Sequence, residues 1–216
     1  MSIGALARDA IALGSTRGRA VLGIAGSPGA GKTTLVELLL EHIDGLCGPG
    51  WAAHVPMDGF HLADVQLRRL GALGRKGAPD TFDVDGYASL LARARADVEK
   101  PLYVPGFERT LEQPLAAALV VLPQARLVIT EGNYLLLDDP GWRAARRQMD
   151  AVWFVAADEG LRTERLVDRH VAFGKSAEQA RDWVTVVDQR NADLVSATQH
   201  GADRVIANGR DGWRPA

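Results

Sequence analysis

The residues whose types and spacing most clearly suggest chemistry lie at positions 26–34. They read Gly26-Ser27-Pro28-Gly29-Ala30-Gly31-Lys32-Thr33-Thr34 and match the phosphate-binding (Walker A, or P-loop) pattern G-x-x-x-x-G-K-[ST] at each specified position. Glycines let successive backbone N–H groups turn toward phosphate oxygens, Lys32 would neutralise the β- and γ-phosphates of ATP, and the Thr33 hydroxyl would ligate Mg²⁺. The competing interpretation is a glycine-rich turn before an ordinary helix. The flanks favour phosphate binding, because an apolar strand pattern at 20–25 precedes the motif and a helical pattern at 35–43 follows it.

Two carboxylates follow apolar segments that are typical of buried strands. Asp58 comes directly after residues 52–57, and Glu131 comes after residues 126–130. Because ligands of an open parallel sheet collect at the carboxyl ends of its strands, both side chains are expected on the same edge as the P-loop. Glu131 is the candidate Walker B residue that holds Mg²⁺ or its waters, and Asp58 is placed for chemistry. The alternatives are a solvent-exposed glutamate at the end of its strand and a turn aspartate paired with Gly59.

Three arginines share one face of a helix predicted over residues 158–173. Arg162, Arg165 and Arg169 are spaced i, i+3 and i+7, so their like charges lie close together. A polyphosphate between them would relieve this repulsion, which favours a nucleotide-closing lid at about 158–176. Glu164 and Asp168 lie nearby and leave open the alternative of a charged surface helix.

The elements that must position these residues alternate along the chain. Strand patterns at 20–25, 52–57, 126–131, 151–156 and 204–208 are separated by helical patterns, including 2–14, 62–73 and a helix that Asp85 is expected to cap. The prolines and glycine of residues 101–110 favour a hairpin or rim over a central strand. This order predicts an α/β fold of the P-loop NTPase type, with a doubly wound, mostly parallel sheet covered by helices on both faces and a small helical lid. We expect one domain over residues 1–216.

Length and composition narrow the classes of protein. The formal net charge of −2 over 216 residues gives no sign of a nucleic-acid or anionic-membrane partner. The one cysteine, Cys47, excludes an internal disulfide and suits a reducing compartment. No stretch approaches the roughly 20 apolar residues that span a bilayer. We therefore expect a cytoplasmic protein without membrane insertion. A homodimer is one candidate assembly.

Taken in this order, the motifs resemble those of the uridine kinase, phosphoribulokinase and pantothenate kinase superfamily of P-loop kinases, over about residues 21–208. The nearest resemblance is to the bacterial nucleoside/nucleotide kinase-like branch, which includes proteins named as fructose-transport-system kinases. Residues 75–79, 81–83, 104–109 and 131–136 carry this nearer resemblance.

The resemblance implies roles for individual residues. Asp58 would be the base that accepts the proton of the acceptor hydroxyl, Asp83 would hold sugar hydroxyls, and His61 and Arg109 would lie near the acceptor. Arg165 and Arg169 would be lid arginines that close on ATP. The run Asp58-Gly59-Phe60-His61 departs from the Asp-Ser-Phe-Tyr form usual in uridine kinases, which argues against uridine as the acceptor.

The sequence thus predicts an ATP- and Mg²⁺-dependent kinase that phosphorylates a hydroxyl of a small metabolite. Sugars (including fructose-type sugars), nucleosides and related polyols are the expected acceptors, held by loops at about 58–112. Alternatives are a uridine or pantothenate kinase and, from another class, a nucleotide-dependent switch or regulatory ATPase that works with a transporter. A GTPase switch is disfavoured, since no Asn-Lys-x-Asp element is present.

Overall fold

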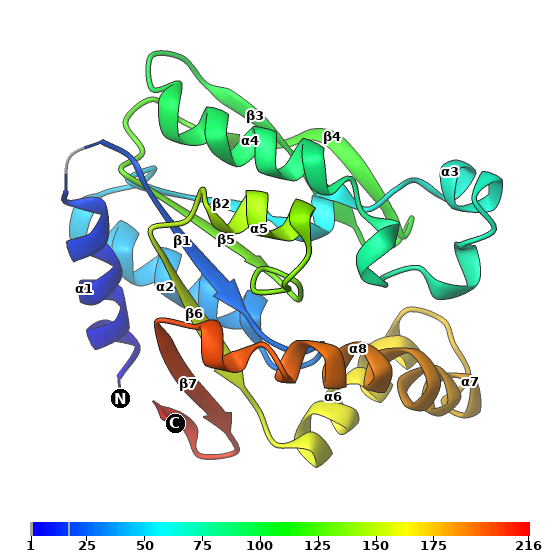
Figure 1. Ribbon diagram of the computed structural model, residues 1–216. Helices are drawn as coiled ribbons and strands as arrows, with labels where there is room; N and C mark the ends of the chain where they lie inside the picture. The colour runs from blue at the N-terminus through cyan, green and yellow to red at the C-terminus, as the bar shows by residue number, and fades with distance from the viewer. Residues whose placement is uncertain (1, 17) are drawn as a thin grey trace.

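The computed structural model describes residues 2–16 and 18–216, and its main feature is a six-stranded sheet (Figure 1). The strand order is β2-β5-β1-β6-β7-β8, and all neighbours pair in parallel except β7 and β8. The strands are β1 (Ala20–Ala25), β2 (Ala52–Pro56), β5 (Leu127–Gly132), β6 (Ala151–Ala156), β7 (Arg204–Gly209) and β8 (Gly212–Pro215). The predicted mostly parallel sheet is confirmed, but the sequence analysis ended the sheet with residues 204–208 and missed β8.

Helices cover both faces of this sheet, as its apolar central strands require. Alternate residues of β1 point to opposite faces, so Leu22 and Ile24 join one core while Val21 and Ala25 join the other. Helices α1 and α2 pack on the first face, and α4, α5 and part of α8 pack on the second. These helices are α1 (Ile3–Gly14), α2 (Lys32–Cys47), α4 (Val84–Ala96), α5 (Pro140–Arg146) and α8 (Gln189–Ser196).

The segment between β2 and α4 corrects two expectations. The helix expected over residues 62–73 is shorter, because Gly71 adopts φ 66° and closes α3 (Asp64–Arg69) after two turns. The expected cap Asp85 is wrong: Asp83 is the N-cap of α4, and its carboxylate accepts a hydrogen bond of 3.0 Å from the Gly86 N–H. Short helical turns η1 (Met57–Phe60), η2 (Leu73–Arg75) and η3 (Pro79–Thr81) complete this segment.

A separate antiparallel hairpin lies beyond β2. It pairs β3 (Leu102–Glu108) with β4 (Gln113–Val121), which confirms the hairpin expected at 101–110, although β4 was not predicted. The register shifts between Val104 and Gly106, and on the opposite strand Ala117 adopts φ 56°. This bulge bends the hairpin over η1, where the Pro105 carbonyl would lie 2.3 Å from any Cβ at Gly59. The hairpin is thereby held against the end of β2.

The expected lid region is a set of consecutive helices beside the carboxyl ends of the strands (Figure 1). It consists of α6 (Glu159–Ala172), α7 (Ala177–Trp183) and a π-helical turn, η4 (Val184–Asp188), which runs into α8 and the short turn η5 (Gln199–Gly201). Ser176 caps α7 in a capping box with Gln179.

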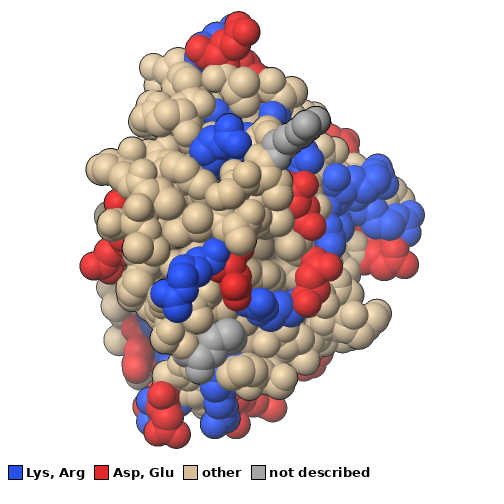
Figure 2. All heavy atoms as spheres, turned by 90° about the vertical axis from the view of Figure 1, so that its left-hand side faces the viewer, with Lys and Arg blue, Asp and Glu red and all other residues tan. Residues whose placement is uncertain are grey.

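The surface of the described part of the chain shows mixed charge. Lys and Arg side chains are interspersed with Asp and Glu on the face seen in Figure 2. In residues 2–16 and 18–216, we find no helix with the length and apolar character needed to cross a membrane.

Candidate active site

The P-loop connects the carboxyl end of β1 to α2, where the strand order reverses and open α/β sheets bind ligands. Gly31 has φ 96°, and a Cβ there would lie 2.3 Å from the Asn208 amide nitrogen. Only glycine fits both the backbone and this close approach. The Asn208 amide donates to the Ala30 carbonyl at 2.8 Å, so a side chain of strand β7 fixes the position of the loop.

Lys32 is the first residue of α2 and lies over the strand ends. Its side chain is 8% exposed, and its ammonium donates to the Ser27 carbonyl at 3.2 Å and to Asn133 Oδ1 at 2.7 Å. Burial lowers the Lys32 pKa to about 8, against the opposing effect of the nearby Glu131 carboxylate. A bound polyphosphate would supply the negative charge that this buried ammonium lacks.

The predicted metal ligands lie side by side. The Thr33 hydroxyl donates to Glu131 Oε1 at 3.3 Å, and Glu131, the penultimate residue of β5, is 6% exposed. Burial, and next the charge of Asp58, raise the Glu131 pKa to about 7. A bound cation would stabilise the ionised form of this buried carboxylate. Hydroxyl and carboxylate oxygens are ligands that Mg²⁺ prefers. The pair therefore fits Mg²⁺.

Asp58 lies in η1, directly beyond the end of β2, and its side chain is half-buried. Arg109, from the turn that joins β3 to β4, contacts the carboxylate at 3.3 Å. Burial favours the neutral acid, but the neighbouring cationic groups outweigh burial and lower the Asp58 pKa. Burial also lowers the His61 pKa, so at neutral pH the guanidinium of Arg109 is the contact that keeps Asp58 ionised.

The loops predicted to hold the acceptor form a wall that combines aromatic rings with charged pairs. The His61 ring lies between Phe82 and Phe107, with ring centroids 4.1 and 4.9 Å away, and its Nδ1 is 2.8 Å from the Asp58 carbonyl. Lys76 donates to Asp64 at 2.7 Å across this wall. The sequence analysis noted Lys76 only as part of a motif and missed Asp64, because their pairing joins loop segments whose conformation no periodicity reveals.

The predicted arginines occupy different positions. Arg169 faces the cavity, and no acid of the described residues forms an ion pair with it; burial lowers its pKa. Arg162 is buried, donates to the Pro28 carbonyl at 3.4 Å and contacts Gln189. Arg165 has a buried Nη1 without a hydrogen-bond partner. Arg162 and Arg165 lie outside the lining of the main cavity, so their contact with ATP stays a prediction.

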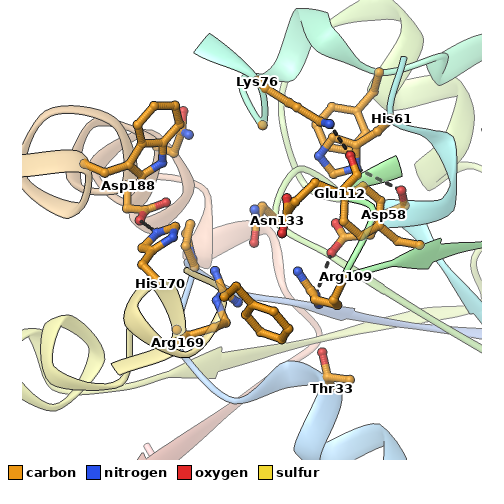
Figure 3. A pocket seen from close by; sticks show the side chains of 18 of the residues that line it. Thr33, Asp58, His61, Lys76, Arg109, Glu112, Asn133, Arg169, His170 and Asp188 are labelled. Atoms are coloured by element: carbon orange, nitrogen blue, oxygen red, sulfur yellow. Dashed lines mark hydrogen bonds and ion pairs between the residues drawn. The ribbon is translucent and has the colours of Figure 1, made fainter. Parts of the chain in front are cut away.

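Most of these groups meet around a cavity of about 320 Å³ between the lid helices and the loops predicted to hold the acceptor (Figure 3). The predicted residues that line it are Pro28, Gly29, Lys32, Thr33, Asp58, His61, Arg109, Glu131 and Arg169. Asp83 is exposed and caps α4 instead, so its contact with acceptor hydroxyls stays a prediction. Asn133, at the centre of the cavity in Figure 3, was not singled out as a site residue.

Comparison with known proteins places this geometry in a family. No protein-family model matches the chain. A Schizosaccharomyces pombe protein named "Putative uridine kinase C227.14" is 32% identical over 194 residues, which cover 87% of this chain and 83% of the relative. The chain belongs to the P-loop kinases of the uridine kinase type.

Solved structures agree with this assignment. The kinase superposes with a TM-score of 0.85 on the crystal structure of a "putative fructose transport system kinase" from Silicibacter sp. TM1040, at 33% identity over 95% of this chain and 98% of the other. YFH7 of Saccharomyces cerevisiae, a P-loop-containing protein, gives a TM-score of 0.80 at 19% identity, covering 98% and 100% of the two chains, which shows the shared fold alone. The resemblance expected from the motifs is confirmed.

Proposed function

We propose that this kinase transfers the γ-phosphoryl group of ATP, with Mg²⁺, to a hydroxyl group of a small metabolite. A sugar, including a fructose-type sugar, a nucleoside or a related polyol is the proposed acceptor. The observation that carries the proposal is that Lys32, Thr33 and Glu131 share one cavity with the ionised carboxylate of Asp58. An acceptor hydroxyl placed between Asp58 and the P-loop would lie in line for transfer.

Different side chains of the site would have different roles in the phosphoryl transfer. Asp58 orients the acceptor hydroxyl and takes its proton as that oxygen bonds to the γ-phosphorus and the bond from phosphorus to the ADP oxygen breaks. Lys32, the loop amides and Arg169 stabilise the negative charge of the transferred group. Thr33 and Glu131 would hold Mg²⁺, which when bound neutralises charge on the β- and γ-phosphate oxygens. His61 and Arg109 would position the acceptor.

A panel of sugars, nucleosides, polyols and pantothenate, assayed for ADP release and for the phosphorylated product, tests the proposal. Acceptor-stimulated ADP formation supports a kinase, and the active compound separates a sugar kinase from a uridine or pantothenate kinase. A slow basal rate that no acceptor changes would instead support a nucleotide-dependent switch or an ATPase that works with a transporter.

Substitution of Asp58 tests the assigned base. We expect Asp58→Asn to lower kcat by about 10² to 10⁴ with the acceptor found above, because the amide cannot take the proton. Binding of ATP, measured by calorimetry, should change little. Turnover near the wild-type rate in Asp58→Asn would exclude Asp58 as the base.

Substitution of Lys32 tests the phosphate cradle. Lys32→Ala removes the buried ammonium, so nucleotide affinity and turnover should fall together, each by about 10-fold or more. Calorimetry with ADP and steady-state kinetics measure the two effects. Full activity in Lys32→Ala would contradict the proposed contact with phosphate.

A further inference from the structure

The last two residues of β5 and the two residues that follow them, 131–134, contact several parts of the site. Glu131 contacts Thr33, and a Cβ at Gly132 would lie 2.5 Å from Met57, the residue before Asp58. Tyr134 is buried, and its hydroxyl donates to the Gly77 carbonyl of the acceptor loops. Asn133 lies between these fixed neighbours, so its backbone is held on both sides.

The orientation of the Asn133 amide follows from its neighbour. An ammonium group has only donors, so the atom 2.7 Å from Lys32 Nζ must be the carbonyl oxygen Oδ1. The amide nitrogen, with two N–H donors, is then directed away from Lys32. None of the described residues accepts a hydrogen bond from this nitrogen, and the side chain lines the cavity.

Figure 3 shows where this amide lies. Asn133 projects between Arg169 and His170 of the lid on one side and Asp58 on the other. The Lys32 ammonium uses two of its three N–H groups, on Ser27 and Asn133, and keeps one for a phosphate. A phosphoryl group that contacts Lys32 and faces Asp58 would therefore lie within reach of the Asn133 amide.

We propose that Asn133 is a catalytic residue of the phosphoryl transfer, whose Oδ1 holds Lys32 while its Nδ2 donates a hydrogen bond to an oxygen of the γ-phosphoryl group. The inference rests on the proposed function. Charge spreads over the equatorial oxygens of the transferred group, and a fixed, uncharged donor stabilises that charge without repelling the Lys32 ammonium.

The first test compares two nucleotides and needs no acceptor. Binding of ADP and of a non-hydrolysable ATP analogue, each with Mg²⁺, is measured by calorimetry for the wild type and Asn133→Ala. We expect the analogue to lose roughly 10-fold in affinity, as for a hydrogen bond to a charged group, while ADP changes by less than about 2-fold. Equal losses for both nucleotides would show that Asn133 only positions Lys32 and would overturn the proposal.

The second test separates the donor from the acceptor atom of the amide. Asn133→Asp keeps an oxygen for Lys32, so the melting temperature should be retained, but it loses the donor. We expect kcat to fall by about 10² or more, and further than in Asn133→Ala. If Asn133→Asp retains turnover near the wild-type rate, the donor role is wrong.

A matched control lies five positions further along the chain. Asp138 is 87% exposed, and among the described residues its carboxylate pairs with Arg143 alone, so Asp138→Asn should leave nucleotide affinity and turnover unchanged. Failure of the proposed function remains distinguishable, since it would appear as a wild-type protein that binds nucleotide but phosphorylates no acceptor. In that case the calorimetric comparison still decides whether Asn133 contacts the γ-phosphoryl group.

Discussion

Glu131 and Lys32 are two buried ionisable groups of opposite sign whose pKa values are shifted toward each other. Burial raises the Glu131 pKa to about 7 and lowers the Lys32 pKa to about 8. Below pH 7 a proton competes with Mg²⁺ for Glu131, and above pH 8 the free enzyme loses the charge on Lys32 that attracts phosphate. We therefore expect the affinity for MgATP to be greatest between about pH 7 and 8 and to fall on both sides.

Calorimetry at pH 6, 7.5 and 9, in buffers of different ionisation enthalpy, measures this dependence. Binding should release a proton from Glu131 on the acid side and take up a proton on Lys32 on the alkaline side. Glu131→Gln should remove the acid dependence, and Lys32→Arg the alkaline one. The same affinity at pH 6 and pH 7.5 in the wild type would contradict the Glu131 assignment.

At the residue scale, the sequence located the groups whose position follows from a strand end. The P-loop and Asp58 follow buried strands and Glu131 lies at the carboxyl end of one, so the edge of a parallel sheet brings them together. Asn133 was included only as part of the motif at residues 131–136, because its place in the site depends on a side-chain contact with Lys32 from a distant segment. Side-chain contacts between distant segments produce no regular spacing in the sequence from which they could be predicted.

At the element scale, the β3–β4 hairpin contains one alanine whose backbone conformation is unfavourable for a residue with a side chain. Ala117 has φ 56°, a left-handed conformation that costs a non-glycine residue roughly 1–2 kcal/mol. The side chain is exposed, so Ala117→Gly loses little packing. Glycine also loses more backbone entropy on folding than alanine does, and this cost offsets part of the strain relieved. We therefore expect Ala117→Gly to raise the free energy of unfolding by about 0.5–1 kcal/mol.

Denaturant unfolding of Ala117→Gly beside Ala116→Gly measures this effect. Ala116 is also exposed but has a negative φ, so glycine there should destabilise the strand. Equal effects of the two substitutions would show that the backbone at Ala117 is unstrained. The bulge itself lay beyond sequence analysis, since PLAAALVV reads as a uniform apolar segment.

At the scale of the whole molecule, the end of the sheet that provides stability lies opposite the end that binds ligands. Arg19 precedes β1, is 4% exposed and donates to five backbone carbonyls, those of Ala94, Asp97, Leu122, Pro123 and Ala125. It thereby joins the end of α4 to the turn before β5. The P-loop lies at the far end of β1, about 20 Å away at the usual rise per residue.

We expect Arg19→Ala to destabilise the protein by about 3 kcal/mol or more, because buried carbonyls would lose their donors. Nucleotide affinity, measured by calorimetry below the melting temperature, should stay within about 2-fold of the wild type. Arg19→Lys should lose somewhat less stability, since an ammonium supplies three of the five donors. A large change in nucleotide affinity in a folded Arg19 variant would contradict this separation.

The hydrogen bond from Asn208 to the P-loop affects the point during synthesis at which the kinase can first bind nucleotide. Residues 26–34 leave the ribosome well before β7, because Asn208 is synthesised 178 residues after Ala30. A nascent chain that ends before β7 has the whole nucleotide motif but lacks the strand that braces it. We expect such ribosome-bound intermediates to bind ATP poorly, so that this enzyme becomes competent only after β7 has been synthesised and has paired with the sheet.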